Sequence, residues 1–548
     1  MRARLHPTDG GRAAVLAELA RAPLDLLVIG GGINGGGIAR EAALRGLRVG
    51  LVDKGDFGSG TSSRSSKLIH GGLRYLELGD LRLVFEACQE RDLLRRRLAP
   101  HLVRPLPFLF PVYAGDSRGL LAISAGLWLY DILATFRNIR WHRRLSRQAT
   151  LALEPGLRAQ GLRGAGLYYD CWTDDARLTL ETILSARLEG ALVCNYVAVT
   201  ALRKRDGRIG GVTLRDAVGG RTLDVAAAVV VNATGPWVDA VRTLDDPAAS
   251  PLLRLTKGVH IVVPRARVGN RHAVVLRAPT DRRVMFAIPW GEQVLVGTTD
   301  TDHSGTADNV QADRADVEYL LEAVNHQFPT AALRAEDVVS AFAGLRPLVA
   351  PSGAQSASPS AVSREETIVT SPSGLVSLAG GKLTTYRRVA IAVVARVVAE
   401  LRARGDRRRF PKSQSHRKPL VGARASNGAA SGWAEDGHLR TRYGGRVEEL
   451  VSVLASDGRL REPLAPPLED LRGEICMATE GEMAVSLEDV LRRRLHVALR
   501  DPSQGLGVAR EVAALMAESL GWDETRRRQE EEAYRHRVAE ERRRWGSR

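Results

Sequence analysis

The chain has 548 residues, 44% of them apolar, which is enough to bury a large core and too many for general disorder. Its net charge of +16 accompanies an ordinary 26% of charged residues and only 5% of aromatic residues, which leaves few stacking platforms for nucleic acid. The four cysteines are far apart in the sequence, which argues against a disulfide framework and a zinc site. We therefore expect no metal and, without an apolar export signal at residues 1–22, a cytoplasmic location.

The first element with a clear function is a strand, helix and strand of the dinucleotide-binding type. Apolar strands expected at 25–29 and 48–52 flank a helix, which follows a turn with the G-x-G-x-x-G spacing. Glycines at these positions permit a tight turn, let the backbone approach a pyrophosphate at the helix N-terminus, and allow the helix to pack on the strand. An acidic residue that ends the second strand is placed to accept a ribose hydroxyl. The residues assigned here are Gly30, Gly32, Gly35 and Asp53.

The segment 120–130 is the nearest approach to a membrane-spanning run, and it falls short of the roughly 18 apolar residues required. Four arginines follow it between 137 and 144. A buried helix with a solvated basic end is the plainer interpretation, and a helix resting on a membrane surface is the alternative.

Later segments repeat the strand-then-glycine pattern. Apolar strands expected at 225–231 and 375–379 each end in glycine, which is typical of one nucleotide site assembled from distant segments. Runs at 258–263, 284–289 and 294–298 predict an inserted sheet that caps the cofactor.

The predicted fold class is α/β. It combines a Rossmann-like dinucleotide-binding domain, an inserted antiparallel-sheet substrate domain and a C-terminal helical domain. The predicted boundaries are an oxidoreductase region at 1–402, with dinucleotide-binding segments at about 24–100, 165–250 and 340–402 and a capping sheet at about 251–339, a basic linker at 403–420, and an α-helical domain at 421–548.

The most specific motif is TSSRSSKLIHGGLRYLE at 61–77. Together with YYDCWTDDAR at 168–177, NATGPW at 232–237, GLRP at 344–347 and GGKLTTYR at 380–387, it resembles the FAD-dependent glycerol-3-phosphate dehydrogenases. The resemblance is strong over about residues 24–402 and looser in the helical C-terminus. Asp53 stands where the family more often has Glu, and either carboxylate can accept a ribose hydroxyl.

This resemblance implies noncovalent FAD, sn-glycerol 3-phosphate as substrate and dihydroxyacetone phosphate as product. It also implies a membrane quinone as electron acceptor, reached from the inner face of the cell membrane by a peripheral enzyme. We further expect a homo-oligomer. Besides the four residues above, the motifs assign to FAD Asn34, Ser62, Ser63, Ser65, Ser66, Lys67, Val197, Thr234, Gly235, Gly380, Gly381, Lys382, Leu383 and Thr384. Hydrogen bonding within the loop is the alternative role of the serines.

The chemistry of alcohol oxidation selects the remaining candidates, because it needs a base for the hydroxyl proton and an anion site for the phosphate. Planar guanidiniums suit a phosphate, and Arg346 and Arg74 lie within motifs rather than in charged runs, with Tyr75 beside the latter. His260, on a strand of the capping sheet, is the favoured base because imidazole titrates near neutrality. His70 is its competitor. Lys382 could stabilise negative charge on the reduced flavin or the developing alkoxide.

Three other functions stay open at this point. An oxidase would use the same substrate and flavin motifs and pass the electrons to oxygen. Another flavin oxidoreductase of this fold, acting on an amino or hydroxy acid, would need an anchor for a carboxylate. A non-catalytic basic binding protein would contain no flavin.

Overall fold

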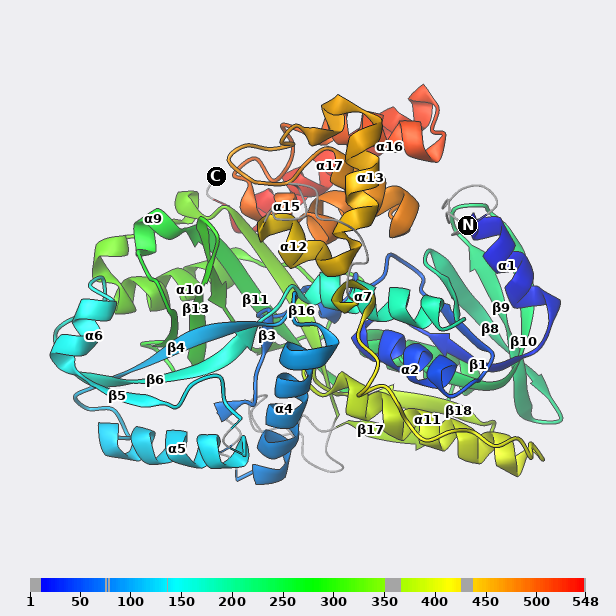
Figure 1. Cartoon of the computed structure of the whole chain (residues 1–548), viewed down its shortest axis with the longest axis horizontal. Helices are drawn as coiled ribbons and strands as arrows, with labels where there is room; N and C mark the ends of the chain where they lie inside the picture. The colour runs from blue at the N-terminus through cyan, green and yellow to red at the C-terminus, as the bar shows by residue number, and fades with distance from the viewer. Residues whose placement is uncertain are drawn as a thin grey trace.

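The computed structural model describes residues 11–73, 76, 79–135, 137–349, 366–424 and 437–546. Two β-sheets lie side by side, each flanked by helices, and the C-terminal helices lie across the top of both (Figure 1). The predicted substrate residues Arg74 and Tyr75 lie outside the described residues. Among the helices that the structure describes, none is long and apolar enough to cross a membrane.

The first sheet has the doubly wound arrangement predicted for the dinucleotide domain. Its strands are β1 (Leu24–Ile29), β2 (Val49–Val52), β7 (Leu192–Cys194), β8 (Val197–Arg205), β9 (Arg208–Asp216), β10 (Thr222–Asn232), β17 (Thr367–Thr370) and β18 (Leu375–Ala379). They follow the order β17-β18-β10-β1-β2-β7, in which the five strands from β18 to β7 are parallel and β9 joins β10. The strands predicted at 25–29, 225–231 and 375–379 are confirmed as neighbours in this sheet.

Both faces of this sheet are covered, which explains why its strands are continuously apolar. The covering helices are α1 (Gly11–Arg21), α2 (Ile33–Leu44), α7 (Asp175–Leu188), α8 (Val238–Asp245) and α11 (Tyr386–Ala403). Leu26 and Val28 pack with α2, α7 and α11, while Leu27 and Ile29 pack on the opposite face with α1 and β9. This alternation follows from the period of two along a strand.

The second sheet is larger than the predicted insertion at 251–339. Its strands are β3 (Leu68–Ile69), β4 (Arg104–Tyr113), β5 (Arg143–Ser146), β6 (Leu162–Trp172), β11 (Leu253–Pro264), β12 (Ala273–Arg277), β13 (Val284–Trp290), β14 (Gln293–Gly297), β15 (Thr301–Asp302) and β16 (Ser340–Val349). The predicted boundaries differ because β4 and β6 extend this sheet through β12, and β16 pairs with β11 along its length. Apart from the β4·β12 pair, its ladders are antiparallel.

The two faces of the second sheet have different neighbours. Helix α10 (Arg314–Gln327) covers one face, where Val259, Ile261 and Val263 of β11 are buried. Helices α4 (Leu81–Leu93) and α5 (Leu120–Leu133) pack on the other, which Val262 faces. By the same alternation, His260 lies on the α4–α5 side.

The C-terminal region is helical, as predicted. It contains α12 (Gly437–Tyr443), α13 (Val447–Ser456), α14 (Gly473–Cys476), a π-helical turn η12 (Asp489–Arg494), α15 (Val497–Arg500), α16 (Ala509–Leu520) and α17 (Glu524–Trp545). The segment predicted as a basic linker packs against α2, because the Arg45 Nε donates to the Pro411 carbonyl at 2.9 Å and the Ser413 hydroxyl to Glu41 at 2.9 Å. The short helices α6 (Arg147–Leu153) and α9 (Arg265–Val268) complete the elements used below.

Candidate active site

A central cavity of about 450 Å³ brings together motifs that are far apart in the sequence. Its walls include the serine loop (residues 61–67), the lysine loop (residues 380–384), strands β11 and β16, and helix α5. The predicted site residues that line it are Ser65, Ser66, His70, His260, Arg346, Gly380, Gly381, Lys382, Leu383 and Thr384.

His260 is held in one orientation within this cavity. Its Nε2 lies 2.8 Å from the Ser66 hydroxyl, and its ring stacks on Phe342 with centroids 5.1 Å apart. Gly297 faces it across the ladder, where a Cβ atom would lie 2.2 Å from His260 Cδ2. Glycine at that position therefore provides the space for the imidazole.

The protonation of His260 differs from the sequence-based expectation. Burial, reinforced by the positive charges of Arg346 and Lys67, lowers the pKa of His260 to about 3. The imidazole is therefore neutral at physiological pH, whereas its ordinary value places its titration near neutrality.

Arg346 shares the carboxylate of Asp300 with a second arginine, Arg283, which the sequence analysis did not identify. Its Nη1 donates to Asp300 Oδ1 at 2.9 Å and its Nη2 to the Thr298 hydroxyl at 3.0 Å. Arg283 donates to the other oxygen of Asp300, also at 2.9 Å, and it lines the same cavity. A Cβ at position 258 would lie 2.6 Å from Arg346 Nη2, which explains the glycine there. Arg283 was missed in the sequence because it is adjacent to Arg282, and such arginine pairs are usually solvent-exposed in a chain rich in arginine.

The loops bearing His70 and Lys382 are tied together. The His70 amide donates to the Thr384 hydroxyl at 3.2 Å, and that hydroxyl lies 3.3 Å from the His70 carbonyl. Gly380 and Gly381 have positive φ angles of 78° and 93°, which glycine adopts without strain. Both candidate groups thus lie on loops with a defined conformation at the cavity wall.

The glycine turn (residues 30–35) is as compact as its spacing predicts. Gly30 has a φ of 105°, and a Cβ there would lie 2.7 Å from the Ala233 carbonyl oxygen and 2.9 Å from the Thr234 Cα. A Cβ on Gly35 would lie 1.8 Å from the Gly30 carbonyl oxygen. No side chain larger than hydrogen fits at either position.

The residues around this turn have partners of their own. The Ser62 hydroxyl accepts from the Ile33 amide at 3.0 Å and lies 3.1 Å from the place of a Cβ on Gly32, so it serves the helix N-terminus. Ser63 belongs to the same 3₁₀ turn. Asn34 Nδ2 lies 3.4 Å from the Gly380 carbonyl, and its Oδ1 is buried with no hydrogen-bond partner among the described residues.

Asp53 occupies the predicted position at the end of β2. Its carboxylate accepts from the amides of Gly31 at 2.6 Å and Gly55 at 2.8 Å, and its carbonyl accepts from the Val197 amide at 2.6 Å. Burial outweighs these bonds and raises the pKa of Asp53 to about 6. A further hydroxyl donor would stabilise the poorly solvated charge.

Lys67 has a different partner from the one expected. Its ammonium lies 2.6 Å from Asp175, and both side chains are fully buried. Asp175 also accepts from the Ser65 amide and hydroxyl. The ammonium of Lys67 therefore stabilises the serine loop through Asp175.

One group of described side chains, His438, Asp470 and Glu474, is spaced closely enough for a metal ion. Arg442 forms ion pairs with both carboxylates, and Arg500 pairs with Asp470 at 2.7 Å. These guanidiniums already balance the negative charge, so the group resembles a buried ionic network.

The glycine turn and the lysine loop fit FAD. The turn is too tight for a Cβ at Gly30 or Gly35, so the start of α2 lies close against the end of β1. The Asn34 Oδ1 is buried without a hydrogen-bond partner among the described residues, and Asp53 stands at the strand end that a ribose approaches in this fold. The lysine loop lines the same cavity as both histidines.

The comparisons with known proteins agree with this geometry. A family described as FAD dependent oxidoreductase matches residues 25–387, and one described as the C-terminal domain of alpha-glycerophosphate oxidase matches residues 413–527. Glycerol-3-phosphate dehydrogenase 2 of Mycobacterium tuberculosis is 40% identical over 522 residues, covering 93% of this chain and 87% of that protein. The aerobic glycerol-3-phosphate dehydrogenase of Bacillus subtilis is 35% identical over 94% of each chain.

Solved structures show the same relationship. The glycerol-3-phosphate dehydrogenase from Bacillus halodurans complexed with FAD has a TM-score of 0.78 and 31% identity, and the match covers 98% of this chain and 97% of that one. Glycine oxidase from Geobacillus kaustophilus, at 21% identity and a TM-score of 0.50, shares the fold alone. Because a match at 40% identity covers 93% of this chain, the chain belongs to the family of FAD-dependent glycerol-3-phosphate dehydrogenases.

Proposed function

We propose that this protein oxidises sn-glycerol 3-phosphate to dihydroxyacetone phosphate, with FAD as hydride acceptor and a membrane quinone as the final acceptor. The observation that carries the proposal is that one cavity contains both a pair of arginines, Arg346 and Arg283, and an imidazole, His260, that Ser66 holds in place. Three relatives of 31–40% identity are named glycerol-3-phosphate dehydrogenases, which supports this substrate.

Arg346 and Arg283 would bind the phosphate. A phosphate dianion carries more charge than the carboxylate of an amino or hydroxy acid, so two guanidiniums favour the phosphate. Asp300 lies between them and fixes their orientation. In our proposal Arg74 and Tyr75 contact the same ligand.

His260 would accept the proton of the secondary hydroxyl. When bound, FAD supplies the acceptor for the hydride that leaves the same carbon. A neutral imidazole can take the proton without first losing one, and Ser66 and Phe342 hold it in place. Lys382 and the amides of the lysine loop would stabilise negative charge that develops during the transfer.

For the cofactor, we propose that the helix N-terminus at the glycine turn binds the pyrophosphate and that Asp53 binds the adenosine ribose.

Gly35→Val should abolish FAD binding, because a side chain there meets the Gly30 carbonyl and displaces the helix amides from the pyrophosphate. Flavin absorbance per chain measures this. As a control, Gly46→Val lies just beyond α2, where a Cβ would meet nothing within 4 Å, although its φ of 78° adds backbone strain. Full flavin content in Gly35→Val would contradict the placement.

Anaerobic mixing with sn-glycerol 3-phosphate tests the reaction itself. We expect the flavin absorbance to bleach with this substrate and to stay unchanged with glycerol, which lacks the phosphate. Bleaching by an amino or hydroxy acid in place of glycerol 3-phosphate would favour the alternative substrate class.

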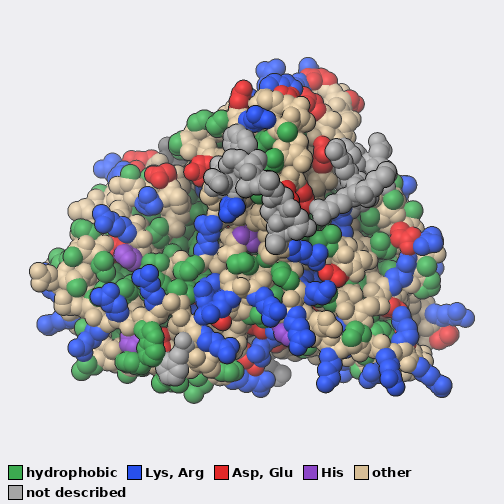
Figure 2. All heavy atoms as spheres, in the orientation of Figure 1, with side chains coloured by type: hydrophobic (Ala, Val, Ile, Leu, Met, Phe, Trp, Pro, Cys, Tyr) green, Lys and Arg blue, Asp and Glu red, His purple; other side chains and the backbone are tan. Residues whose placement is uncertain are grey.

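Helix α5 supports contact with a membrane. Leu121, Trp128 and Ile132 on α5 and the nearby Trp141 are 72%, 48%, 50% and 54% exposed. Figure 2 shows hydrophobic side chains gathered at the lower left, over α5, with Lys and Arg side chains beside and above them. The same helix contributes Ile123 and Leu129 to the cavity wall, so a lipid-soluble acceptor would meet the protein close to the cavity.

The acceptor is tested by reoxidation of the reduced enzyme. We expect rapid reoxidation by a quinone dissolved in anionic lipid vesicles and slow reoxidation by dissolved oxygen. The reverse order, with hydrogen peroxide formed stoichiometrically, would show an oxidase.

A further inference from the structure

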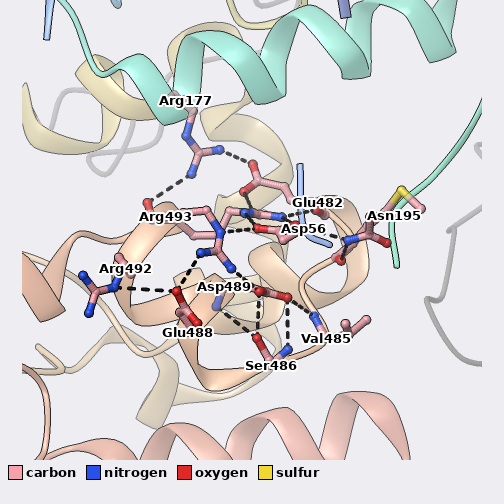
Figure 3. A network of polar contacts seen from close by, with 12 residues as sticks. Asp56, Arg177, Asn195, Glu482, Val485, Ser486, Glu488, Asp489, Arg492 and Arg493 are labelled. Atoms are coloured by element: carbon pink, nitrogen blue, oxygen red, sulfur yellow. Dashed lines mark hydrogen bonds and ion pairs between the residues drawn. The ribbon is translucent and has the colours of Figure 1, made fainter. Parts of the chain in front are cut away.

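A buried carboxylate, Asp56, connects the dinucleotide domain to the C-terminal helices. It lies three residues after Asp53, and its side chain is fully buried. Arg493 donates to it at 2.6 Å, and Arg494 donates through both Nη atoms at 2.7 and 2.9 Å. Figure 3 shows Asp56 among the side chains of the π-helical turn η12.

Asp56 is ionised in this environment. Burial alone would raise its pKa, but Arg494 and Arg493 lower the pKa of Asp56 to about 2. Burying the Asp56 carboxylate without a counter-charge would cost several kcal/mol of folding free energy. The two guanidiniums are therefore required for the segment around Asp56 to adopt this conformation.

The other side of the same loop is attached to the glycine turn. Within the Asp56 loop (residues 53–58), Asp53 accepts from the Gly31 amide, and the Gly58 amide donates to the Gly31 carbonyl at 2.9 Å. The Phe57 ring leaves no space for a side chain at position 31, where a Cβ would lie 2.5 Å from it. A displacement of the loop therefore displaces the turn.

Neighbouring residues reinforce the connection. Asn195 Nδ2 donates to Asp56 at 3.2 Å and to the Met483 carbonyl at 2.8 Å, so it bridges the loop and the C-terminal region. Tyr196 does the same, since its amide donates to the Gly55 carbonyl at 2.9 Å and its hydroxyl to Asp489 at 2.7 Å.

We propose that Arg493 and Arg494 are positioning residues for the cofactor. Through Asp56, the C-terminal helical domain holds residues 53–58 in the conformation that presents Asp53 and the Gly31 backbone to the adenosine half of FAD. The proposal rests on the assignment of Asp53 to the adenosine ribose made above.

The test compares Arg494→Met with Arg492→Met. Arg492 is a neighbour in the same turn whose ion pairs are with Glu541 and Glu488. FAD release from the diluted holoenzyme is followed by flavin fluorescence, and the Kd for ADP is measured on the full-length chain stripped of flavin. We expect Arg494→Met to weaken both FAD and ADP at least about tenfold and by a similar factor, because the loss concerns the adenosine half, while Arg492→Met leaves both near wild type.

A general loss of structure has a different signature. It would lower the unfolding temperature of the flavin-free protein in both arginine variants. The proposed role instead predicts that adding ADP raises the unfolding temperature of Arg494→Met less than it raises that of the wild type. If Arg494→Met does not fold, Arg494→Lys, which keeps the charge and loses one of the two bonds, should weaken ADP to a smaller extent. The double variant Asp56→Asn/Arg494→Met should bind ADP about as weakly as Asp56→Asn alone, since Asp56→Asn already breaks the ion pair with Arg494.

Wild-type affinity for ADP in Arg494→Met, or an equal loss in Arg492→Met, would overturn the proposal. The variant Asp53→Ala separates its failure from that of the ribose assignment. If Asp53→Ala binds ADP normally, the ribose assignment fails. If Asp53→Ala weakens ADP binding and Arg494→Met does not, the positioning role of Arg493 and Arg494 fails.

Discussion

Arg346→Ala should lower kcat/KM for glycerol 3-phosphate more than about a hundredfold, or about 3 kcal/mol, because a partly buried phosphate loses a charge-assisted pair. Arg283 would remain on Asp300, which limits damage to the surrounding sheet. Arg346→Lys should recover only part of the loss, since an ammonium cannot form two parallel bonds. Steady-state kinetics with flavin content as a reference measure both changes.

The matched control is Arg254→Ala. Arg254 lies on β11 beside β16, is not a lining residue of the cavity, and pairs with Asp302 at 2.7 Å. The variant Arg254→Ala therefore removes a guanidinium near the site but outside the cavity lining. We expect kcat/KM near wild type for this variant. If Arg346→Ala behaves like it, the role of Arg346 is to orient Asp300 and Thr298.

His260→Gln should retain FAD and bind substrate nearly normally, yet slow flavin reduction by roughly 10²–10⁴-fold, the usual contribution of a positioned base. Glutamine can still bond Ser66, so the cavity keeps its shape. Stopped-flow measurement of flavin reduction under saturating substrate gives the rate. The matched comparison is His70→Gln, which we expect to change the flavin spectrum and lower the rate less.

The pH dependence of kcat/KM separates the two histidines. Only a neutral imidazole accepts the proton, so the activity rises with pH through the pKa of the base, and the pKa of about 3 places this limb below the neutral range. The groups facing His260 are Arg346, Lys67 and Ser66, with His70 and Lys382 on the same cavity wall. A limb near pH 6 from the substrate phosphate should persist in both variants. Loss of the low limb in His70→Gln alone would reverse the assignment.

The dinucleotide site could be predicted because its constraints are local. Gly30 and Gly35 are required by contacts within one turn, and such contacts follow directly from spacing. The two histidines and Arg346 were found through motifs, and the structure adds that they share a cavity.

The features that the sequence did not predict depend on contacts between residues that are far apart in the chain. Nothing in β4 or β6 indicates that they extend the capping sheet, because strand order is set by contacts across the whole domain. Arg283 is concealed by an arginine-rich composition. Tyr534, Val538 and Trp545 of α17 are buried, although the surrounding sequence is so charged that it predicts a solvated helix or frayed tail.

The position of Asp56 in the chain has a consequence for biosynthesis. Its partner Arg493 follows 437 residues later, so at about 5–20 residues per second the ribosome needs roughly 20–90 s to supply it. During that interval the nascent chain already displays the glycine turn, but Asp56 has no counter-charge from η12. Nascent chains interrupted before η12 should therefore accumulate as colourless protein, and the flavin should be retained only as the last helices assemble.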